Sequence, residues 1–276
     1  MRYFGYGSNL NTADLARWCE AHGFTASGIR ELGPAWLPDH EPVFHYLSVA
    51  RDGGALSVRP RLGAATPGCL FSCDDEGWRA LDRKEGAKYE RVTRRVLFRG
   101  EDVEATTYVV ASGHREDDLV APQPAYLKLV TDALATRSLP TSQVREAARG
   151  LRIPPLPDAL FVYGTLRRGE SRERLLTDHA PTRWSDARVR GRLLDLGAYP
   201  GMVAGEGEVV GELVRFDALA ELIRALDEVE AFEGYGRSGS LYRRVIVWVG
   251  DQPAWSYRFL SAHEGVPIAS GDWRDR

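Results

Sequence analysis

The segment Tyr-Phe-Gly-Tyr-Gly-Ser-Asn-Leu, residues 3–10, opens the chain, and a related segment, Phe-Val-Tyr-Gly-Thr-Leu, recurs at residues 161–166. Both combine a short apolar stretch with a tyrosine, a glycine and a hydroxyl residue. Each is followed by a second matching segment, Arg-Ala-Leu-Asp-Arg-Lys-Glu at 79–85 and Arg-Ala-Leu-Asp-Glu-Val-Glu at 224–230. A repeat with so long a period predicts two related domains rather than a solenoid of short units.

Length and composition agree with two domains in one chain. The 276 residues suffice for two domains of ordinary size, and the net charge of -3 argues against a nucleic-acid partner. No apolar run approaches the roughly 18 residues of a membrane helix, and no signal peptide is visible. The odd number of cysteines favours reduced thiols, so we expect a cytoplasmic protein without a membrane partner.

The proline-rich segment 153–159 divides the chain, because prolines that close together form a stiff spacer and cannot continue a helix. We therefore predict one domain at 1–152 and another at 160–276. In the first domain we expect helices at 12–22, 75–85, 125–136 and from an N-cap at Ser142, with strands at 43–50, 67–72, 91–98 and 104–110. In the second we expect one helix at 218–230 and strands at 159–163, 187–194, 209–216, 242–249 and 254–260. Many short strands around few helices predict an α+β fold with a small mixed β-barrel and flanking helices in each half.

One glutamate in each half lies on the apolar face of a predicted helix. Glu230 lies four residues beyond Leu226, and Glu85 lies four beyond Leu81, the i, i+4 spacing of one helix face. An inward carboxylate is costly unless it is paired or protonated, and both burial and a helix C-terminus raise its pKa. Such a group suits general acid–base chemistry. The alternative is that both helices end earlier and the glutamates face water.

The repeated turn is a candidate anion cradle. Gly7-Ser8-Asn9 and Gly164-Thr165 each follow a predicted strand, and glycine lets the backbone approach a ligand with free N–H groups. Neither matches a nucleotide-binding P-loop. Taken alone, either segment could be an ordinary turn.

Other signals do not predict a metal or cofactor site. Cys19 and His22 are spaced to share one metal, but no second pair completes a tetrahedral set. We therefore expect no metal and no cofactor. The adjacent Arg167 and Arg168 either attract a substrate carboxylate or belong to a solvated face.

These motifs resemble those of the gamma-glutamylcyclotransferase and AIG2-like family. The family's Tyr-Gly-Ser-Asn-Leu motif is matched at 6–10, its helix ending in glutamate at 81–86, and its Pro-x-Pro-x-Tyr segment at 122–126. The second half resembles the gamma-glutamylamine cyclotransferase branch at 163–169, 226–230 and 271–273. This half lacks the asparagine of the loop and the Pro-x-Pro-x-Tyr helix, so Tyr257 is the candidate for supplying a hydroxyl instead.

The resemblance implies an enzyme of the lyase or acyltransferase type that acts on a small γ-glutamyl amine or peptide. The substrate's own α-amine attacks its δ-carbonyl, and 5-oxoproline and a free amine are released without an enzyme nucleophile. It implies Glu85 and Glu230 as proton shuttles. The substrate-binding residues would be Tyr6, Gly7, Ser8, Asn9, Leu10 and Tyr126 in the first domain, and Tyr163, Gly164, Thr165, Leu166 and Tyr257 in the second.

Two other classes of function stay open. One domain, the second more readily, could have lost turnover and only bind a carboxylate or γ-glutamyl ligand. A purely structural protein would leave both inward glutamates unexplained. The sequence does not identify the leaving amine, a catabolic or biosynthetic role, the number of active domains, or the oligomeric state.

Overall fold

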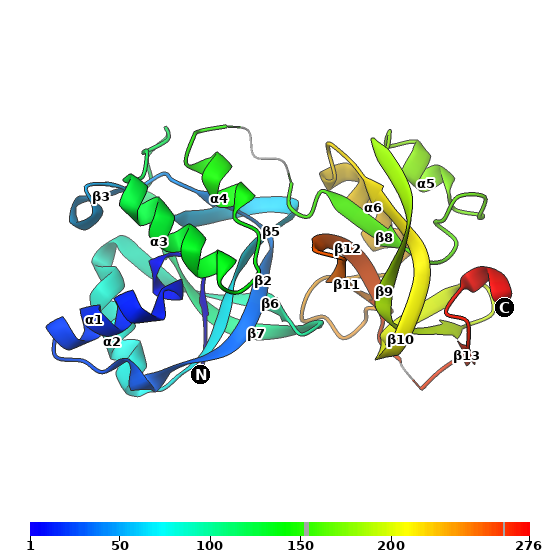
Figure 1. The fold of residues 1–276 in the computed structure, drawn as a ribbon, viewed down its shortest axis with the longest axis horizontal. Coiled ribbons are helices and arrows are strands. Elements are labelled where there is room, and N and C mark those ends of the chain that lie inside the picture. Colours follow the sequence, from blue (N-terminus) through cyan, green and yellow to red (C-terminus); the bar gives the residue numbers. More distant parts are fainter. Residues whose placement is uncertain (152–154, 262) are drawn as a thin grey trace. The chain divides into compact units, whose positions relative to one another are not determined.

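The computed structural model describes residues 1–151, 155–261 and 263–276. The chain divides into two compact units, Met1–Ile153 and Pro154–Arg276, here called the first and second domains (Figure 1). The division drawn from the sequence is close to this one, although the first two residues of the expected linker, 153 and 154, lie outside the described residues. No helix in the described ranges has both the length and the apolar character needed to span a membrane.

The first domain is built on a five-stranded sheet in the order β1-β5-β2-β6-β7, which closes on itself where β1 pairs in parallel with β7. Its interior is filled by apolar side chains such as Phe4, Leu70 and Val96. A separate two-stranded ribbon, β3 with β4, lies outside this sheet. The strands are β1 (Arg2–Gly5), β2 (Ile29–Val43), β3 (Leu47–Ser48), β4 (Gly53–Gly54), β5 (Ser57–Cys73), β6 (Tyr89–Phe98) and β7 (Glu101–Val110).

The helices of the first domain have clear local start and stop signals. The Asn11 side chain accepts from the Asp14 N–H at the start of α1, and Asp74 accepts from the Gly77 N–H at the start of α2. Gly86, with φ 65°, ends α2. The helices are α1 (Thr12–Ala21), α2 (Asp75–Glu85), α3 (Pro124–Ala135) and α4 (Ser142–Ala147), with short 3-10 turns at η1 (Ser8–Leu10), η2 (Ala26–Gly28), η3 (Val49–Arg51), η4 (Gly86–Lys88) and η5 (Ser112–His114).

One expected cap is wrong. Ser142 is the first residue of α4, and the N-cap is Thr141, whose side chain makes no capping hydrogen bond. Thr141 itself has helical backbone angles, so its hydroxyl is not in the extended geometry that usually reaches the first free N–H groups.

The second domain contains a six-stranded sheet in the order β11-β12-β8-β10-β9-β13. Its opening strand β8 pairs in parallel with β12 and antiparallel with β10, as β1 pairs with β7 and β5 in the first domain. The elements are β8 (Ala159–Val162), α5 (Arg174–Thr177), β9 (Arg183–Asp195), β10 (Pro200–Arg215), α6 (Ala220–Val229), β11 (Tyr242–Val249), β12 (Gln252–Phe259), β13 (Val266–Ile268) and η6 (Trp273–Asp275).

The mixed α+β class agrees with the sequence prediction. The barrel expected in the second domain is not seen as a closed ring of strand pairings among the described residues, where β11 and β13 form the two edges of the sheet. Each domain nevertheless brings the end of its opening strand to the C-terminal end of one helix, α2 or α6. That meeting point is where the repeated motifs come together.

Candidate functional site

In the first domain the repeated loop lies at the wall of a cavity of about 610 Å³. Residues 8–10 form the one-turn helix η1 directly after β1, and Glu85 is the last residue of α2. The Leu10 N–H donates back to the Gly7 carbonyl, so it is used within the turn. The N–H groups of Gly7, Ser8 and Asn9 have no partner within the part of the chain that the structure describes. The loop therefore offers three free donors, and Leu10 contributes a buried apolar side chain instead.

Asn9 joins this loop to Glu85. It is only 3% exposed, and its Nδ2 donates to Glu85 Oε1 at 2.7 Å and to the Tyr3 hydroxyl at 2.9 Å. Its Oδ1 is buried without a hydrogen-bond partner among the described residues. The carboxyl group and the free N–H groups are thus held on the same cavity wall.

Burial raises the pKa of Glu85 above its ordinary value. Lys84, the Asn9 hydrogen bond and Arg51 act against this shift because each stabilises the carboxylate. The side chain is only half-buried, since one side of it lines the cavity. Glu85 is therefore an inward carboxyl group that a substrate can reach.

The tyrosines of the first cavity are anchored to the backbone. The Tyr6 hydroxyl donates to the Tyr108 carbonyl at 2.6 Å, and the Tyr126 hydroxyl accepts from the Leu56 N–H at 3.1 Å. Burial raises the pKa of Tyr126 to about 12, so its hydroxyl keeps its proton at neutral pH. Both rings shape the cavity, and the Tyr126 hydroxyl retains a proton to donate.

Several cavity residues were not predicted from the sequence. They come from β-strands, α1, α2, η3, η4 and the loop before β3, and apart from Tyr3 and Lys84, which lie within the repeated segments, no local pattern marks them as neighbours of the repeated loop. They include the basic residues Arg17, Arg51, Lys84 and Lys88 and the aromatic residues Tyr3, Trp18, Tyr46, Tyr89 and Tyr108.

The second domain has a much smaller cavity, of about 60 Å³, in the corresponding place. Tyr163, Gly164, Thr165 and Leu166 line it together with Glu230. Glu230 caps α6 and, within the described part of the chain, its carboxyl group makes no hydrogen bond. Burial raises its pKa to about 7, opposed only by Arg172. The loop and the glutamate therefore meet in this domain too, but without an asparagine between them.

Tyr257 lines the second cavity, but its hydroxyl is not free for a substrate. The hydroxyl donates to Asp227 Oδ1 at 2.6 Å, and Arg244 Nη1 binds Asp227 Oδ2 at 2.9 Å. The first domain repeats this arrangement, with the Tyr108 hydroxyl 2.7 Å from Asp82 Oδ1. Tyr257 is thus the counterpart of Tyr108, and its carbonyl accepts from the Tyr163 hydroxyl at 2.8 Å.

Glu230→Gln is expected to stabilise the protein at alkaline pH. The pKa of Glu230 is about 7 in the folded protein, against an ordinary 4.5, so the folded state favours the protonated carboxyl group. The folded state therefore loses stability as the pH rises through 7 and this group ionises. Removing the ionisable group should increase the free energy of unfolding by about 2–3 kcal/mol at pH 8 and by less than about 1 kcal/mol at pH 5. Urea unfolding at both pH values measures this difference. An equal gain at both would contradict the inward placement of Glu230.

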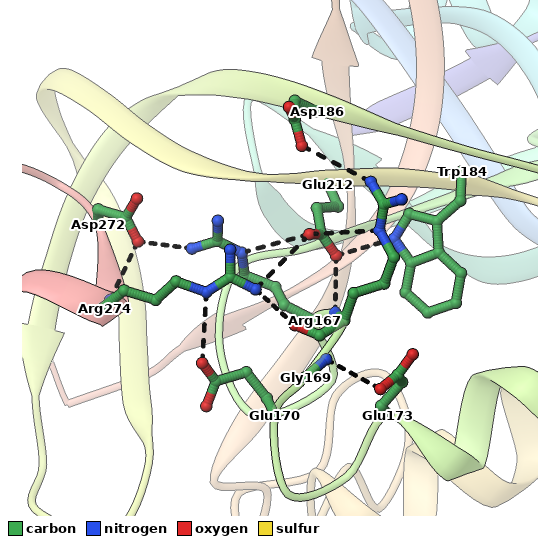
Figure 2. Close-up of polar contacts among 10 residues, drawn as sticks. Arg167, Gly169, Glu170, Glu173, Trp184, Asp186, Glu212, Asp272 and Arg274 are labelled. Atoms are coloured by element: carbon green, nitrogen blue, oxygen red, sulfur yellow. Dashed lines mark hydrogen bonds and ion pairs between the residues drawn. The ribbon is translucent and has the colours of Figure 1, made fainter.

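The side chains of Arg167 and Arg168, which follow the second loop, contact other side chains of the protein and do not line the cavity. Both guanidinium groups lie within 4.0 Å of Glu212, which is buried on β10. Figure 2 shows Glu212 surrounded by arginine side chains and Trp184. Glu212 Oε2 also accepts from the Arg168 N–H at 2.9 Å and from Trp184 Nε1 at 2.8 Å. Glu212 therefore fixes the end of the loop.

Gly164 and Gly7 differ in the space around them. A Cβ at Gly164 would lie 2.3 Å from Pro200 Cγ, whereas a Cβ at Gly7 would approach only the Tyr126 hydroxyl, at 3.7 Å. Gly164→Ala is therefore expected to destabilise the protein by about 1–3 kcal/mol, because the loop must move off β10. The free energy of unfolding of Gly7→Ala should lie within about 0.5 kcal/mol of the wild-type value. Denaturant unfolding of the two variants checks this, and equal stabilities would contradict the close packing at Gly164.

Comparison with known proteins gives two matches within the chain. The family model described as Gamma-glutamyl cyclotransferase, AIG2-like, matches residues 3–127 and again residues 160–275. A putative gamma-glutamylcyclotransferase from Vibrio cholerae is 36% identical over 120 residues, which cover 42% of this chain and 96% of the relative. The gamma-L-glutamyl-butirosin B gamma-glutamyl cyclotransferase of Niallia circulans is 30% identical over 120 residues, which cover 42% of this chain and 74% of that protein.

Among solved structures, one named gamma-glutamyl cyclotransferase aligns with a TM-score of 0.46 at 19% identity, over 55% of this chain and 88% of the other. The two family matches together span most of the chain and include both repeated loops and both glutamates. The chain therefore belongs to the gamma-glutamyl cyclotransferase, AIG2-like family and contains the family's domain twice.

Proposed function

We propose that this protein is a γ-glutamyl cyclotransferase that releases 5-oxoproline and a free amine from a γ-glutamyl amine or peptide. In this reaction the α-amine nitrogen forms a bond to the δ-carbonyl carbon, and the bond from that carbon to the leaving nitrogen breaks. One proton passes from the first nitrogen to the second. Because both reacting groups belong to one substrate, the protein must fold it, hold the developing oxyanion and move the proton.

The observation that supports this most directly is the 2.7 Å hydrogen bond from Asn9 to Glu85 beside the three free N–H groups of the loop. We assign the N–H groups of Gly7, Ser8 and Asn9 to the substrate α-carboxylate or to the oxyanion. Glu85 takes the proton from the attacking amine and returns it to the leaving one. A carboxyl group whose pKa is raised toward neutrality does both more readily than an ordinary glutamate.

The second domain has the same parts in a smaller space. We assign Glu230 the same proton transfer. We assign the same binding role to the N–H groups of Gly164, Thr165 and Leu166, which have no hydrogen-bond partner among the described residues. The pKa of about 7 for Glu230 supports a working acid–base group. We also propose that the protein acts in the cytoplasm, because Cys19, Cys69 and Cys73 are all buried free thiols.

The competing function for the second domain is ligand binding without turnover. It is favoured by Leu166, which occupies the position of Asn9 and cannot hydrogen-bond the glutamate, and by the small cavity. The catalytic interpretation is favoured by Glu230 itself, because a binding module would gain nothing from a buried carboxyl group next to an anion cradle.

One set of variants tests both interpretations. Wild type, Glu85→Gln, Glu230→Gln and the double variant are incubated with a panel of γ-glutamyl amines and peptides, and 5-oxoproline is measured. Release by wild type that disappears only in the double variant supports two active domains. Loss in Glu85→Gln alone supports one active and one binding domain. Full release by the double variant would refute the proposed mechanism.

A further inference from the structure

Lys84 is a buried cation that lines the first cavity. Its side chain is 7% exposed, and its Nζ makes no hydrogen bond among the described residues. Its nearest carboxylate, in Asp14, is 4.0 Å away, at the limit of an ion pair, and the Trp18 ring is 5.8 Å away. A buried ammonium group with three unused donors is costly unless an acceptor reaches it. A ligand in this cavity can supply that acceptor.

The same wall has more positive than negative charge. Arg17 and Arg51 lie 3.4 Å and 3.7 Å from Asp14, so three cations surround this carboxylate. Among the described residues, Glu85 is the other acidic residue that lines the cavity, beside the four basic residues. The Arg51 guanidinium also lies over the Tyr126 ring, 5.2 Å from its centre, which places it beside a residue assigned to the substrate. The cluster of Arg17, Arg51 and Lys84, here called the basic wall, therefore favours an anion in the cavity.

Comparison of the two domains indicates which part of a substrate the basic wall contacts. The glutamate and the loop glycine are present in both domains, so they suit the γ-glutamyl part that all substrates share. Lys84 has no counterpart, because the residue before Glu230 is Val229, which also lines its cavity. Among the described residues, Arg172 is the one basic side chain that lines the second cavity. The basic wall therefore suits the part that differs between substrates, the leaving amine.

We propose that Lys84, with Arg51, forms a subsite in the first domain for an acidic group carried by the leaving amine. The second domain, with Val229 in this place and a smaller cavity, takes γ-glutamyl compounds whose leaving amine is small and uncharged. The two domains then divide γ-glutamyl substrates by the charge of the leaving group. This inference rests on the proposed cyclotransferase function and adds the substrate class of each site.

The test compares substrates that differ only in charge. Glu230→Gln serves as the parent, so that only the first domain can react. The substrates are γ-glutamyl-alanine, its neutral alanine amide, and a γ-glutamyl aminoethyl phosphate, which separates carboxylate from phosphate recognition. The parent should prefer the two acidic substrates over the amide. Lys84→Val, which installs the residue of the second domain, should lower kcat/KM for the preferred acid by about 10-fold to 100-fold more than for the amide, because any effect through Glu85 acts on both substrates alike.

Two further variants separate this role from others. Arg83→Val removes the neighbouring exposed cation of α2 and should leave all substrates unchanged. Lys84→Arg keeps the charge and should retain part of the preference. Lys84→Met keeps the length of the side chain and replaces the valine variant if that one does not fold.

An equal loss on acid and amide, with a shift of the pH profile, would overturn the proposal, because Lys84 would then act only through Glu85. If wild type and parent both release 5-oxoproline from no γ-glutamyl compound, the proposed function fails. Calorimetric binding of γ-glutamyl-alanine and its amide still tests the subsite in that case. Equal affinities of the parent for the two compounds would then overturn it.

Discussion

Glu85→Gln is expected to lower kcat for 5-oxoproline release by about 10²–10⁴-fold in the Glu230→Gln parent, with a much smaller change in KM. Glutamine keeps the size of the side chain and still offers an oxygen to Asn9 Nδ2, which donates to Glu85 Oε1 at 2.7 Å in wild type. The loop and the cavity should therefore persist while the proton transfer is lost. Initial rates over a range of substrate concentrations separate the two parameters.

The matched control for this variant is Asp75→Asn, which changes an exposed carboxylate in the first turn of the same helix. It should leave kcat unchanged. Retention of wild-type kcat by Glu85→Gln would exclude this carboxyl group as the proton shuttle, even if the protein proves to be a cyclotransferase.

Glu212→Ala is expected to destabilise the second domain by about 3–5 kcal/mol. Glu212 is 2% exposed and lies within 4.0 Å of the guanidinium groups of Arg167, Arg168 and Arg274 (Figure 2). Its removal would leave Arg167, which is itself 3% exposed, with Asp272 as its remaining described carboxylate partner. A buried guanidinium group with too few acceptors destabilises the folded state, so the thermal unfolding midpoint should fall by about 10 °C or more.

Glu208 provides the control because it lies on the same strand, β10, and pairs with Arg188 at 3.2 Å, but both side chains are more than 60% exposed. Glu208→Ala should change the free energy of unfolding by less than about 1 kcal/mol. Hydrogen exchange assigned to each domain shows where protection is lost. Similar small losses in both variants would contradict a structural role for Glu212.

Local signals explain the part of the fold that the sequence predicted. The bounds of α2 agree with the prediction because its apolar spacing, the Asp74 cap and the Gly86 stop all lie within the helix or next to it. By contrast, β2 was missed because Pro34, Pro38 and Pro42 interrupt it, and prolines argue against a strand interior. The strand persists with register shifts near Gly33 and Pro38 while it pairs with β5.

The same distinction between local sequence signals and nonlocal packing applies to the candidate site. Glu85, Glu230 and the two loops were predicted because each belongs to a repeated local motif. Lys84 and Arg51 were not, since their place at the cavity depends on how α2 and η3 pack around it. The link between Arg167 and Glu212 is equally nonlocal, because it joins the end of the loop to β10, 45 residues further along the chain.

The hydroxyl of the tyrosine that opens each loop is bonded to a carbonyl on the strand that runs parallel to the opening strand, Tyr6 to Tyr108 and Tyr163 to Tyr257. Each loop can therefore take its final shape only after the strand that carries its own carbonyl partner has left the ribosome. The first domain holds all its assigned residues by Tyr126, well before synthesis of the second begins. A nascent chain should thus gain its two sites one after the other, and a fragment that stops before residue 108 should bind no γ-glutamyl compound.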